Sequence, residues 1–348
     1  MNTSYTIKNP AHLPYRIVAD DSPIAHCNIC PNECQLTPGR VGACRARINK
    51  NGQIVPLAYA KPCSIAVDPM EKKPLFHFFP GESILSLGMA GCNLHCKNCQ
   101  NHSISQVDPR DIPYQSLPPD QLVKIMQTHN LRHVAYTYTE PLVAYEYVLD
   151  CAKAVHDAGF FNVLVSAAYV NIDPLEDLLP FIDGANIDLK SMSDEFYRSN
   201  CKASLQPVLD ALKCFKKFGV VLEITNLVVP TMNDNDENFD KIANFVANEL
   251  GVEIPLHFSR FFPRYKLLGL PPTQQESLDR AKLAAKNAGL QHVYAGNTPG
   301  DEVTYCANCK HPLITRRGYS IISNTLINGA CPNCGNKLYG LFKSNVTI

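Results

Sequence analysis

Short apolar segments and longer amphipathic segments alternate through the middle of the chain, between about residues 81 and 300. The short segments are rich in β-branched residues, which favour strands. These expected strands are Ile84–Leu87, His133–Tyr138, Asn162–Val165, Asn186–Leu189, Val220–Val229, Pro255–Phe258 and His292–Tyr294. The longer segments repeat their apolar residues at helical spacing. These expected helices are Asp120–Thr128, Val143–Ala158, Leu175–Phe181, Leu205–Phe218, Asp236–Asn248 and Gln275–Ala288.

Strands that alternate with helices at this pace predict a parallel sheet joined by crossover helices. Gly159, Gly219 and Gly289 each follow an expected helix, and glycine best accommodates a helix C-terminus. Six or seven such units indicate an α/β fold with a full or partial (β/α) barrel. The loops after the C-terminal ends of barrel strands carry the chemistry. We therefore expect a Cys-rich metal-binding segment over residues 1–80, the barrel over 81–300 and a zinc-ribbon-like domain over 301–348.

The chain has 15 cysteines, and most of them fall into three close groups. The middle group lies in the segment from Gly88 to Asn101, here called the cluster loop, which directly follows the first expected strand. Its spacing is C-x3-C-x2-C, formed by Cys92, Cys96 and Cys99. Three neighbouring thiolates suit a soft metal or an iron–sulfur cluster, and a four-iron cluster here would keep one iron free for a small molecule. The alternative is a zinc site that His95 or His102 completes.

The other two groups flank the expected barrel. The C-terminal group has two C-x2-C pairs, the spacing of a zinc ribbon that a single tetrahedral ion closes, although a rubredoxin-like iron uses the same ligands. Its members are Cys306, Cys309, Cys331 and Cys334. The N-terminal group, here called the N-terminal cysteine set, is suited to zinc or to an auxiliary iron–sulfur cluster. Its members are Cys27, Cys30, Cys34 and Cys44. Cys63 is a spare candidate ligand, and Cys151 and Cys214 fall within expected helices, where core packing is the simplest role.

The segments Lys61–Pro74 and His77–Gly81, followed by the cluster loop, resemble the AmmeMemoRadiSam radical S-adenosylmethionine (SAM) enzyme family. That family is related to the pyruvate formate-lyase activating enzymes. The resemblance continues through Ala135–Pro141, Asn186–Lys190, Ser259–Phe261 and the C-terminal cysteine pairs, so it covers nearly the whole chain.

The resemblance implies a radical SAM barrel with a [4Fe-4S] cluster on the catalytic residues Cys92, Cys96 and Cys99. SAM would chelate the open iron, and reductive cleavage would give a 5′-deoxyadenosyl radical that abstracts hydrogen from an unidentified substrate. Companion proteins of the AMMECR and Memo types and an electron donor of the flavodoxin or ferredoxin type would be the partners. A glycyl-radical enzyme activase is one alternative, and a non-enzymatic iron–sulfur and zinc protein for interaction or electron transfer is another.

The same resemblance implies a set of residues that hold SAM. They are Asn98, Tyr138, Thr139, Glu140, Ser166, Asp188, Lys190 and His257. The family more often has Asn at position 139, a Thr-Asn-Gly run at 166–168 and an aromatic residue at 98. Each group also has a purely structural interpretation: Thr139 and Glu140 as a helix start, Asp188 with Lys190 as an ion pair, and His257 as a core residue.

Charge and composition exclude several classes of protein. Lys+Arg and Asp+Glu number 32 each, and this balance argues against a protein that binds nucleic acid through its phosphates. Between His26 and Leu75 there is a local surplus of basic residues, seven against three acidic ones. No apolar segment is long enough to span a membrane, and Met1 to Ala25 lacks the apolar centre of a signal peptide. Clustered cysteines without an export signal predict a reducing cytoplasm.

Overall fold

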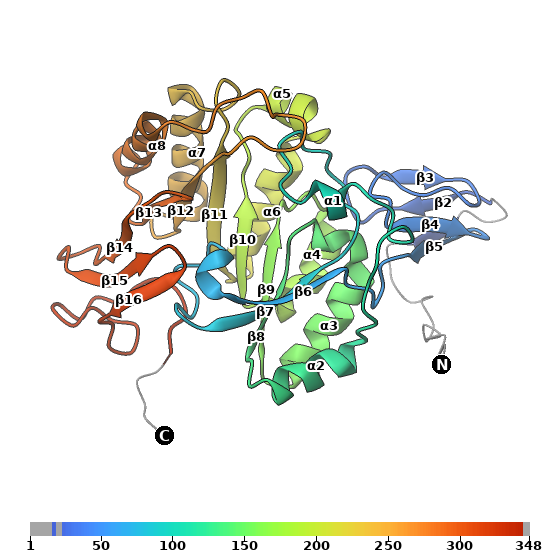
Figure 1. Cartoon of the computed structure of the whole chain (residues 1–348), viewed down its shortest axis with the longest axis horizontal. Coiled ribbons are helices and arrows are strands. Elements are labelled where there is room, and N and C mark those ends of the chain that lie inside the picture. The colour runs from blue at the N-terminus through green and yellow to red at the C-terminus, as the bar shows by residue number, and fades with distance from the viewer. Residues whose placement is uncertain (1–15, 19–22, 344–348) are drawn as a thin grey trace.

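The computed structural model describes residues 16–18 and 23–343. Its centre is an eight-stranded sheet in which the strands follow one another in sequence order from β6 to β13 (Figure 1). Strands β7 to β13 pair in parallel, whereas β6 pairs antiparallel with β7. The strands are β6 (Ser64–Pro69), β7 (Ser83–Gly88), β8 (His133–Tyr136), β9 (Phe161–Ser166), β10 (Gly184–Asp188), β11 (Val221–Val228), β12 (Leu256–Arg260) and β13 (Val293–Gly296). The sheet has β6 and β13 as its edges and is a partial barrel.

Helices connect the parallel strands, as the alternating pattern predicts. The principal ones are α2 (Pro119–Thr128), α3 (Tyr145–Asp157), α4 (Ile172–Leu178), α6 (Gln206–Lys217), α7 (Asp236–Phe245) and α8 (Gln275–Asn287). Shorter turns of helix flank them: α1 (His102–Ser105), η3 (Pro141–Ala144), η4 (Leu179–Phe181), α5 (Asp194–Phe196), η5 (Tyr197–Cys201) and η6 (Val246–Leu250). Each long helix buries one apolar face, and Gly159, Gly219 and Gly289 follow three of them with positive φ, as expected.

Two small sheets from the N-terminal region lie beside the central sheet, near α1 (Figure 1). They comprise β1 (Arg16–Val18), β2 (Ala25–Cys27) and β3 (Cys34–Leu36), and the hairpin of β4 (Arg47–Lys50) and β5 (Gln53–Pro56). Arg47 anchors this region because its guanidinium donates two hydrogen bonds, of 2.5 and 2.7 Å, to the Glu146 carboxylate on α3. Both side chains are buried, so removing either partner would leave an uncompensated charge.

The connection between β6 and β7 occupies the interior beneath the sheet. It begins with η2 (Met70–Lys72), and its Phe78 packs in a separate core cluster with Ala135 and Val163 of neighbouring strands. The C-terminal ribbon, residues 301–343, closes over this connection from the side of the sheet opposite the N-terminal sheets (Figure 1). It contains β14 (Asp301–Tyr305), β15 (Pro312–Arg317) and β16 (Ser320–Asn324).

Buried polar contacts fasten the ribbon to the connection. Arg316 of β15 is fully buried, donates to the Phe76 carbonyl oxygen at 2.6 Å and stacks over the Phe76 ring. Phe78 also forms a backbone bridge with Leu341. These contacts join segments more than 200 residues apart in sequence, so the ribbon is part of the barrel wall in space.

The sequence-based expectations for the fold are confirmed. Every expected strand and helix is present, with ends displaced by a few residues. Because β7 to β13 are parallel, the loops that follow them lie together at the C-terminal ends of the strands. One difference concerns the start of the sheet, because β6 already belongs to it, ahead of the expected boundary near residue 81. No helix in the described ranges has the length and apolarity to cross a membrane. The N-terminal segment from Met1 to Ala25, which the sequence predicts not to be a signal peptide, lies mostly outside the described residues.

Candidate active site

The cluster loop follows β7 and is held by backbone hydrogen bonds from two distant parts of the chain. The Cys92 N–H donates to the Cys44 carbonyl oxygen at 3.2 Å, and the His95 N–H donates to the Cys201 carbonyl oxygen at 2.8 Å. Gly91 has φ +94°, and a Cβ there would lie 2.5 Å from the Cys44 oxygen. Only glycine permits both this backbone conformation and this close approach.

The three cluster-loop cysteines line one wall of a cavity of about 970 Å³. Two of their sulfurs make weak hydrogen bonds: the Leu94 N–H donates to Cys92 Sγ at 3.4 Å, and Ser105 Oγ lies 3.2 Å from Cys99 Sγ. The three sulfurs do not all lie within 4.8 Å of one another. Three soft, spread thiols that face a cavity are a suitable donor set for an iron–sulfur cluster with one accessible iron.

The zinc alternative for this loop lacks its fourth ligand. His95 Nδ1 is 2.8 Å from the Gln106 side-chain oxygen, and the His102 ring stacks on Tyr265 with centroids 4.5 Å apart. Among the described residues, neither histidine belongs to a compact metal-ligand group with the cluster-loop cysteines.

Cys201, which ends η5, is a neighbour of the loop that the sequence did not reveal. Its thiol hydrogen-bonds the sulfur of Cys96, and this contact lowers the pKa of Cys96 to about 7 while it raises the pKa of Cys201. Lys190 lies next to both sulfurs. Burial alone would lower the pKa of Lys190, but Asp188 and the two sulfurs raise it well above its ordinary value. The ammonium therefore adds positive charge where thiolates must form.

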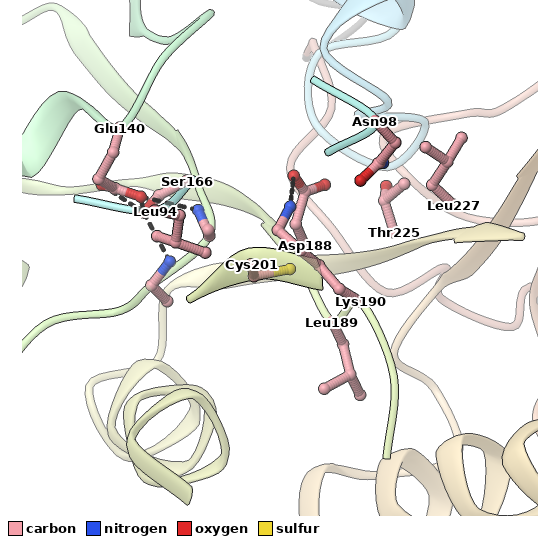
Figure 2. A network of polar contacts seen from close by, with 12 residues as sticks. Leu94, Asn98, Glu140, Ser166, Asp188, Leu189, Lys190, Cys201, Thr225 and Leu227 are labelled. Atoms are coloured by element: carbon pink, nitrogen blue, oxygen red, sulfur yellow. Dashed lines mark hydrogen bonds and ion pairs between the residues drawn. The ribbon is translucent and has the colours of Figure 1, made fainter. Parts of the chain in front are cut away.

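Glu140 lies on the turn after β8, and this buried residue lines the cavity. It accepts hydrogen bonds from Ser166 Oγ at 2.8 and 2.9 Å and from the Ala167 N–H at 3.0 Å (Figure 2). Burial raises the pKa of Glu140 to about 7. The structural interpretation of this turn is also correct, with one change: Glu140, not Thr139, caps the following turn of helix by accepting from the Leu142 N–H at 3.2 Å.

The other residues of this turn hold the loops in place. Thr139 donates from its hydroxyl to the Met89 carbonyl oxygen at 2.7 Å. Tyr138 has φ +70°, a strained conformation for a bulky residue, and its carbonyl oxygen accepts from the Asn101 side chain at 2.6 Å. The Tyr138 hydroxyl donates to Asp68 at 2.5 Å.

Asp188 and Lys190 lie at the end of β10, where their side chains form an ion pair with a 2.9 Å separation (Figure 2). The expected ion pair at the barrel rim is therefore present. Both residues also line the cavity, and almost half of the Asp188 side chain is exposed, so one carboxylate face can still receive a ligand. Asn98 lines the same wall, but its side-chain oxygen already accepts from Asn200 at 2.9 Å.

His257 of β12 is buried and hydrogen-bonded, with Nε2 2.7 Å from a carboxylate oxygen of Glu223. Glu223 has a fully buried side chain and also accepts from the His77 N–H at 2.7 Å. The Phe76 ring meets the His257 ring edge-on at 4.8 Å. His257 thus combines a core position with a place on the cavity wall.

Two groups of polar residues at this site escaped the sequence reasoning. Burial alone would raise the pKa of Asp68, but hydrogen bonds from Lys72, Lys73 and Tyr138 lower it below its ordinary range. Glu223 stands in the middle of an apolar strand segment, which is an observable signal for a partnered buried charge. Asp68 and Lys73 carried no such signal, because their segment has no clear period.

The cavity has a volume of about 970 Å³ and unites the candidate residues from several loops. All eight residues that the resemblance assigns to SAM line it, together with the three cluster-loop cysteines. Gly318 and Tyr319 of the C-terminal ribbon also contribute to its wall, as does Lys282 of α8. The volume lies at the upper end of the range for ligand sites, roughly 300–1,000 Å³.

The ribbon cysteines form a compact ligand group. Cys306 and Cys334 have sulfurs 3.6 Å apart, as do Cys309 and Cys331, and all four sulfurs lie within 4.8 Å. Tetrahedral coordination at a Zn–S distance of about 2.3 Å places sulfurs about 3.8 Å apart. This site can therefore hold one metal ion.

The N-terminal cysteine set is gathered as well, but less tightly. Cys27 and Cys34 are direct partners in the β2–β3 register, and Cys44 interacts electrostatically with both of them and with Cys30. Cys63 lies apart from this set, and its thiol donates to the Gly88 carbonyl oxygen at 3.4 Å. Cys151 and Cys214 pack in the core, as expected.

Comparison with known proteins agrees with this geometry. A family model described as the radical SAM superfamily matches residues 87–246, the span from β7 to α7. An uncharacterized protein of Methanocaldococcus jannaschii is 45% identical over 323 residues, which cover 92% of this chain and 96% of that protein. The pyruvate formate-lyase 1-activating enzyme of Escherichia coli K12 is 25% identical over 212 residues, 55% of this chain and 84% of that enzyme.

Among solved structures, a radical SAM methyltransferase from Sphaerobacter thermophilus matches with a TM-score of 0.49 and 14% identity, over 63% of this chain and 67% of that one. The matched family span contains the cluster loop, the Glu140 turn and the Asp188–Lys190 pair. Residues 87–246 therefore form a radical SAM domain, and the chain is an enzyme related to the pyruvate formate-lyase activating enzymes.

Proposed function

We propose that this protein binds a [4Fe-4S] cluster at Cys92, Cys96 and Cys99 and cleaves SAM reductively to abstract hydrogen from a substrate. The observation that carries the proposal is the shared cavity, because three thiols and eight polar residues from five separate segments of the barrel line it. When bound, the cluster and SAM supply a one-electron cleavage that yields methionine and a 5′-deoxyadenosyl radical. The chain supplies ligands, orientation and exclusion of water.

The Glu140 turn is the proposed site for the ammonium group of SAM. Ser166 and the Ala167 N–H fix the carboxylate in place, so it is preorganised to accept a charge-assisted hydrogen bond. A buried carboxylate is costly by itself, and a bound ammonium group would offset that cost. Thr139 and Tyr138 position the turn through their contacts with Met89 and Asp68.

Asp188 and Lys190, at the end of β10, are the proposed contacts for other polar groups of SAM in the cavity. The Lys190 ammonium, next to Cys96 and Cys201, favours thiolate formation and offsets the negative charge of the ligands. His257 would lie beside the adenine or the carboxylate of SAM, and Glu223 fixes the orientation of its ring. Asn98 would reach the base with its amide.

The substrate is the open part of the proposal. The relatives that are activating enzymes support a glycyl-radical activase, whereas the motifs that resemble the AmmeMemoRadiSam family support a small molecule handled with AMMECR-type and Memo-type proteins. The C-terminal ribbon favours the small molecule. Gly318 and Tyr319 form part of the cavity wall, and a cavity of about 970 Å³ has the size of a small-molecule site.

The flanking metal sites complete the proposal. The ribbon would hold zinc, since four thiolates at tetrahedral spacing form a closed structural site. The N-terminal cysteine set would hold a second metal centre. A donor of the flavodoxin or ferredoxin type would supply electrons in a reducing cytoplasm, and the three regions, residues 1–80, 81–300 and 301–348, would act as one unit.

The test is SAM cleavage by anaerobically reconstituted protein with dithionite and no added substrate. We expect slow formation of 5′-deoxyadenosine and methionine, and its loss in Cys96→Ala. The matched control is Cys214→Ala, a buried cysteine of α6 outside the cavity. Intact SAM after prolonged incubation of a fully reduced four-iron sample would favour the non-enzymatic interpretation. Deuterium transfer from candidate substrates into 5′-deoxyadenosine would identify the hydrogen donor.

A further inference from the structure

The N-terminal cysteine set has the arrangement of a cluster ligand set. Cys27 and Cys34 face each other across the β2–β3 pair, Cys30 lies in the turn between these strands, and Cys44 comes from the next loop. Electrostatic contacts link Cys44 with each of the other three. Four thiols from one short segment are thus neighbours in the folded chain.

The spacing of these thiols distinguishes them from the ribbon. The ribbon sulfurs lie within 4.8 Å of one another, as one tetrahedral ion requires. In the N-terminal cysteine set, all of which is described, no three sulfurs meet that limit. The cluster-loop cysteines share this wider spacing. A four-iron cluster needs such an open set, because each thiolate binds a different iron.

The surroundings of the sulfurs also suit an iron–sulfur centre. The Ala43 N–H donates to Cys34 Sγ at 3.5 Å, backbone N–H groups of residues 32 and 46 donate to Cys30 and Cys44, and the Asn93 side chain donates to Cys30. Hydrogen bonds to ligand sulfurs are one way in which proteins set a cluster's reduction potential.

The set is in direct contact with the cluster loop. Cys44 accepts from the Cys92 N–H through its carbonyl oxygen, so a ligand residue of one group touches a ligand residue of the other. Asn93, the residue after Cys92, donates to the Cys30 sulfur and accepts at its own carbonyl oxygen from the Asn32 side chain at 3.0 Å. Asn93, which is bonded to Cys92 and hydrogen-bonded to the Cys30 sulfur, therefore connects the N-terminal cysteine set with the cluster-loop cysteines.

We propose that Cys27, Cys30, Cys34 and Cys44 hold an auxiliary [4Fe-4S] cluster through which electrons enter the cluster-loop site. This inference rests on the proposed function. A reduced donor of the flavodoxin or ferredoxin class gives one electron to the auxiliary cluster and is oxidised by one electron. The auxiliary cluster passes that electron through Cys44 or Asn93 to the centre at Cys92, returns to its oxidised state and transfers no proton.

The outer surface of this region suits such a donor. Cys30 and Cys34 are partly exposed, and Arg40 in the loop between β3 and β4 and Lys50 at the end of β4 have exposed side chains. Arg40, Arg45 and Lys50 outnumber Glu33, the one acidic residue between positions 23 and 56, and such a basic surface would attract an acidic electron carrier and speed its encounter.

The first test counts metals in the full chain after anaerobic reconstitution. We expect wild type to contain about four irons more than Cys30→Ala/Cys34→Ala, with a matching amount of sulfide. The triple variant Cys92→Ala/Cys96→Ala/Cys99→Ala should keep about four irons, and Cys214→Ala should match wild type. Mössbauer spectra of wild type should show two four-iron clusters, an observation independent of any variant's folding. Loss of one zinc with unchanged iron in the double variant would overturn the inference.

The second test addresses electron entry. Reduction of the cluster-loop centre by a reduced flavodoxin-type donor should be at least tenfold slower in the double variant, while reduction by dithionite should stay complete. Equal rates with the protein donor would overturn the entry role. The two proposals can be contradicted separately. If the triple variant contains no iron, only the auxiliary cluster is contradicted. If the triple variant contains as much iron as wild type, the cluster-loop assignment is contradicted.

Discussion

The ribbon cysteines and the cluster-loop cysteines solve different problems with the same side chain. The ribbon brings four sulfurs to within 4.8 Å and surrounds them with its own turns. The cluster loop spreads three sulfurs along the wall of a cavity of about 970 Å³. A closed set can stabilise a fold around a metal, whereas an open set leaves the metal accessible to a ligand. The geometry of the thiols, more than their number, separates structure from chemistry.

The largest effect is expected when the three cluster-loop cysteines, the open set, are replaced. Cys92→Ala/Cys96→Ala/Cys99→Ala should abolish SAM cleavage and remove about four irons, while the ribbon keeps its metal. The fold should persist, because β7 and the loop anchors at Cys44 and Cys201 are backbone contacts. Metal analysis and thermal unfolding check this result. Unchanged iron in this variant would contradict the assignment.

Removal of the closed set should have the converse effect. Cys306→Ala/Cys309→Ala should release one metal ion and make residues 301–343 sensitive to limited proteolysis, because a small ribbon folds largely on its metal. The cluster-loop irons should remain. A ribbon that loses its metal yet resists protease would show that Arg316 and the Phe78–Leu341 bridge are sufficient to hold it.

A substitution in the cavity next to the cluster loop should weaken SAM binding without changing the iron content. We expect Asp188→Ala to weaken SAM binding by about 1–3 kcal/mol, the contribution of a hydrogen bond to a charged group. Equilibrium dialysis measures the dissociation constant. The control Asp194→Ala removes an exposed carboxylate that pairs with Arg198 outside the cavity, and it should bind SAM normally. Equal losses in both variants would argue for a general effect on folding.

The pH dependence of SAM binding tests the Glu140 turn. Burial raises the pKa of Glu140 to about 7, so the carboxylate gains a proton and loses its charge as the pH falls below that value. SAM binding should therefore weaken by up to about tenfold between pH 8 and pH 6. Glu140→Gln should bind weakly with a flatter profile. An unchanged slope in this variant would assign the titration to another group.

The smallest expected effect concerns Cys201. Its thiol hydrogen-bonds Cys96, and such bonds to ligand sulfurs raise a cluster's reduction potential. Cys201→Ala should lower the midpoint potential slightly, because one neutral hydrogen bond contributes about 0.5–1.5 kcal/mol. Redox titration followed by electron paramagnetic resonance measures the potential, with Cys214→Ala as control. Loss of iron instead of a shifted potential would make Cys201 a ligand.

The sequence by itself determined the parts of this protein that depend on local order. Apolar periodicity located every strand of the parallel part of the sheet, and the spacing of Cys92, Cys96 and Cys99 singled out a loop that lines the cavity. These features can be predicted from the sequence because side chains point to the same face every two residues in a strand and about every 3.6 residues in a helix. The cysteines of the cluster loop are likewise only a few positions apart.

The tertiary structure decided which distant residues meet. Cys201 reaches Cys96 across about a hundred residues, Glu223 orients His257 from the next strand, and Arg316 closes the interior from the far end of the chain. Cysteine spacing did not decide between zinc and an iron–sulfur cluster as the group that the N-terminal cysteine set would hold, because ligand order along the chain does not fix the separation of sulfurs. That separation depends on the pairing of β2 with β3 and on the packing of the Cys44 loop against the cluster loop, both of which exist only in the folded chain.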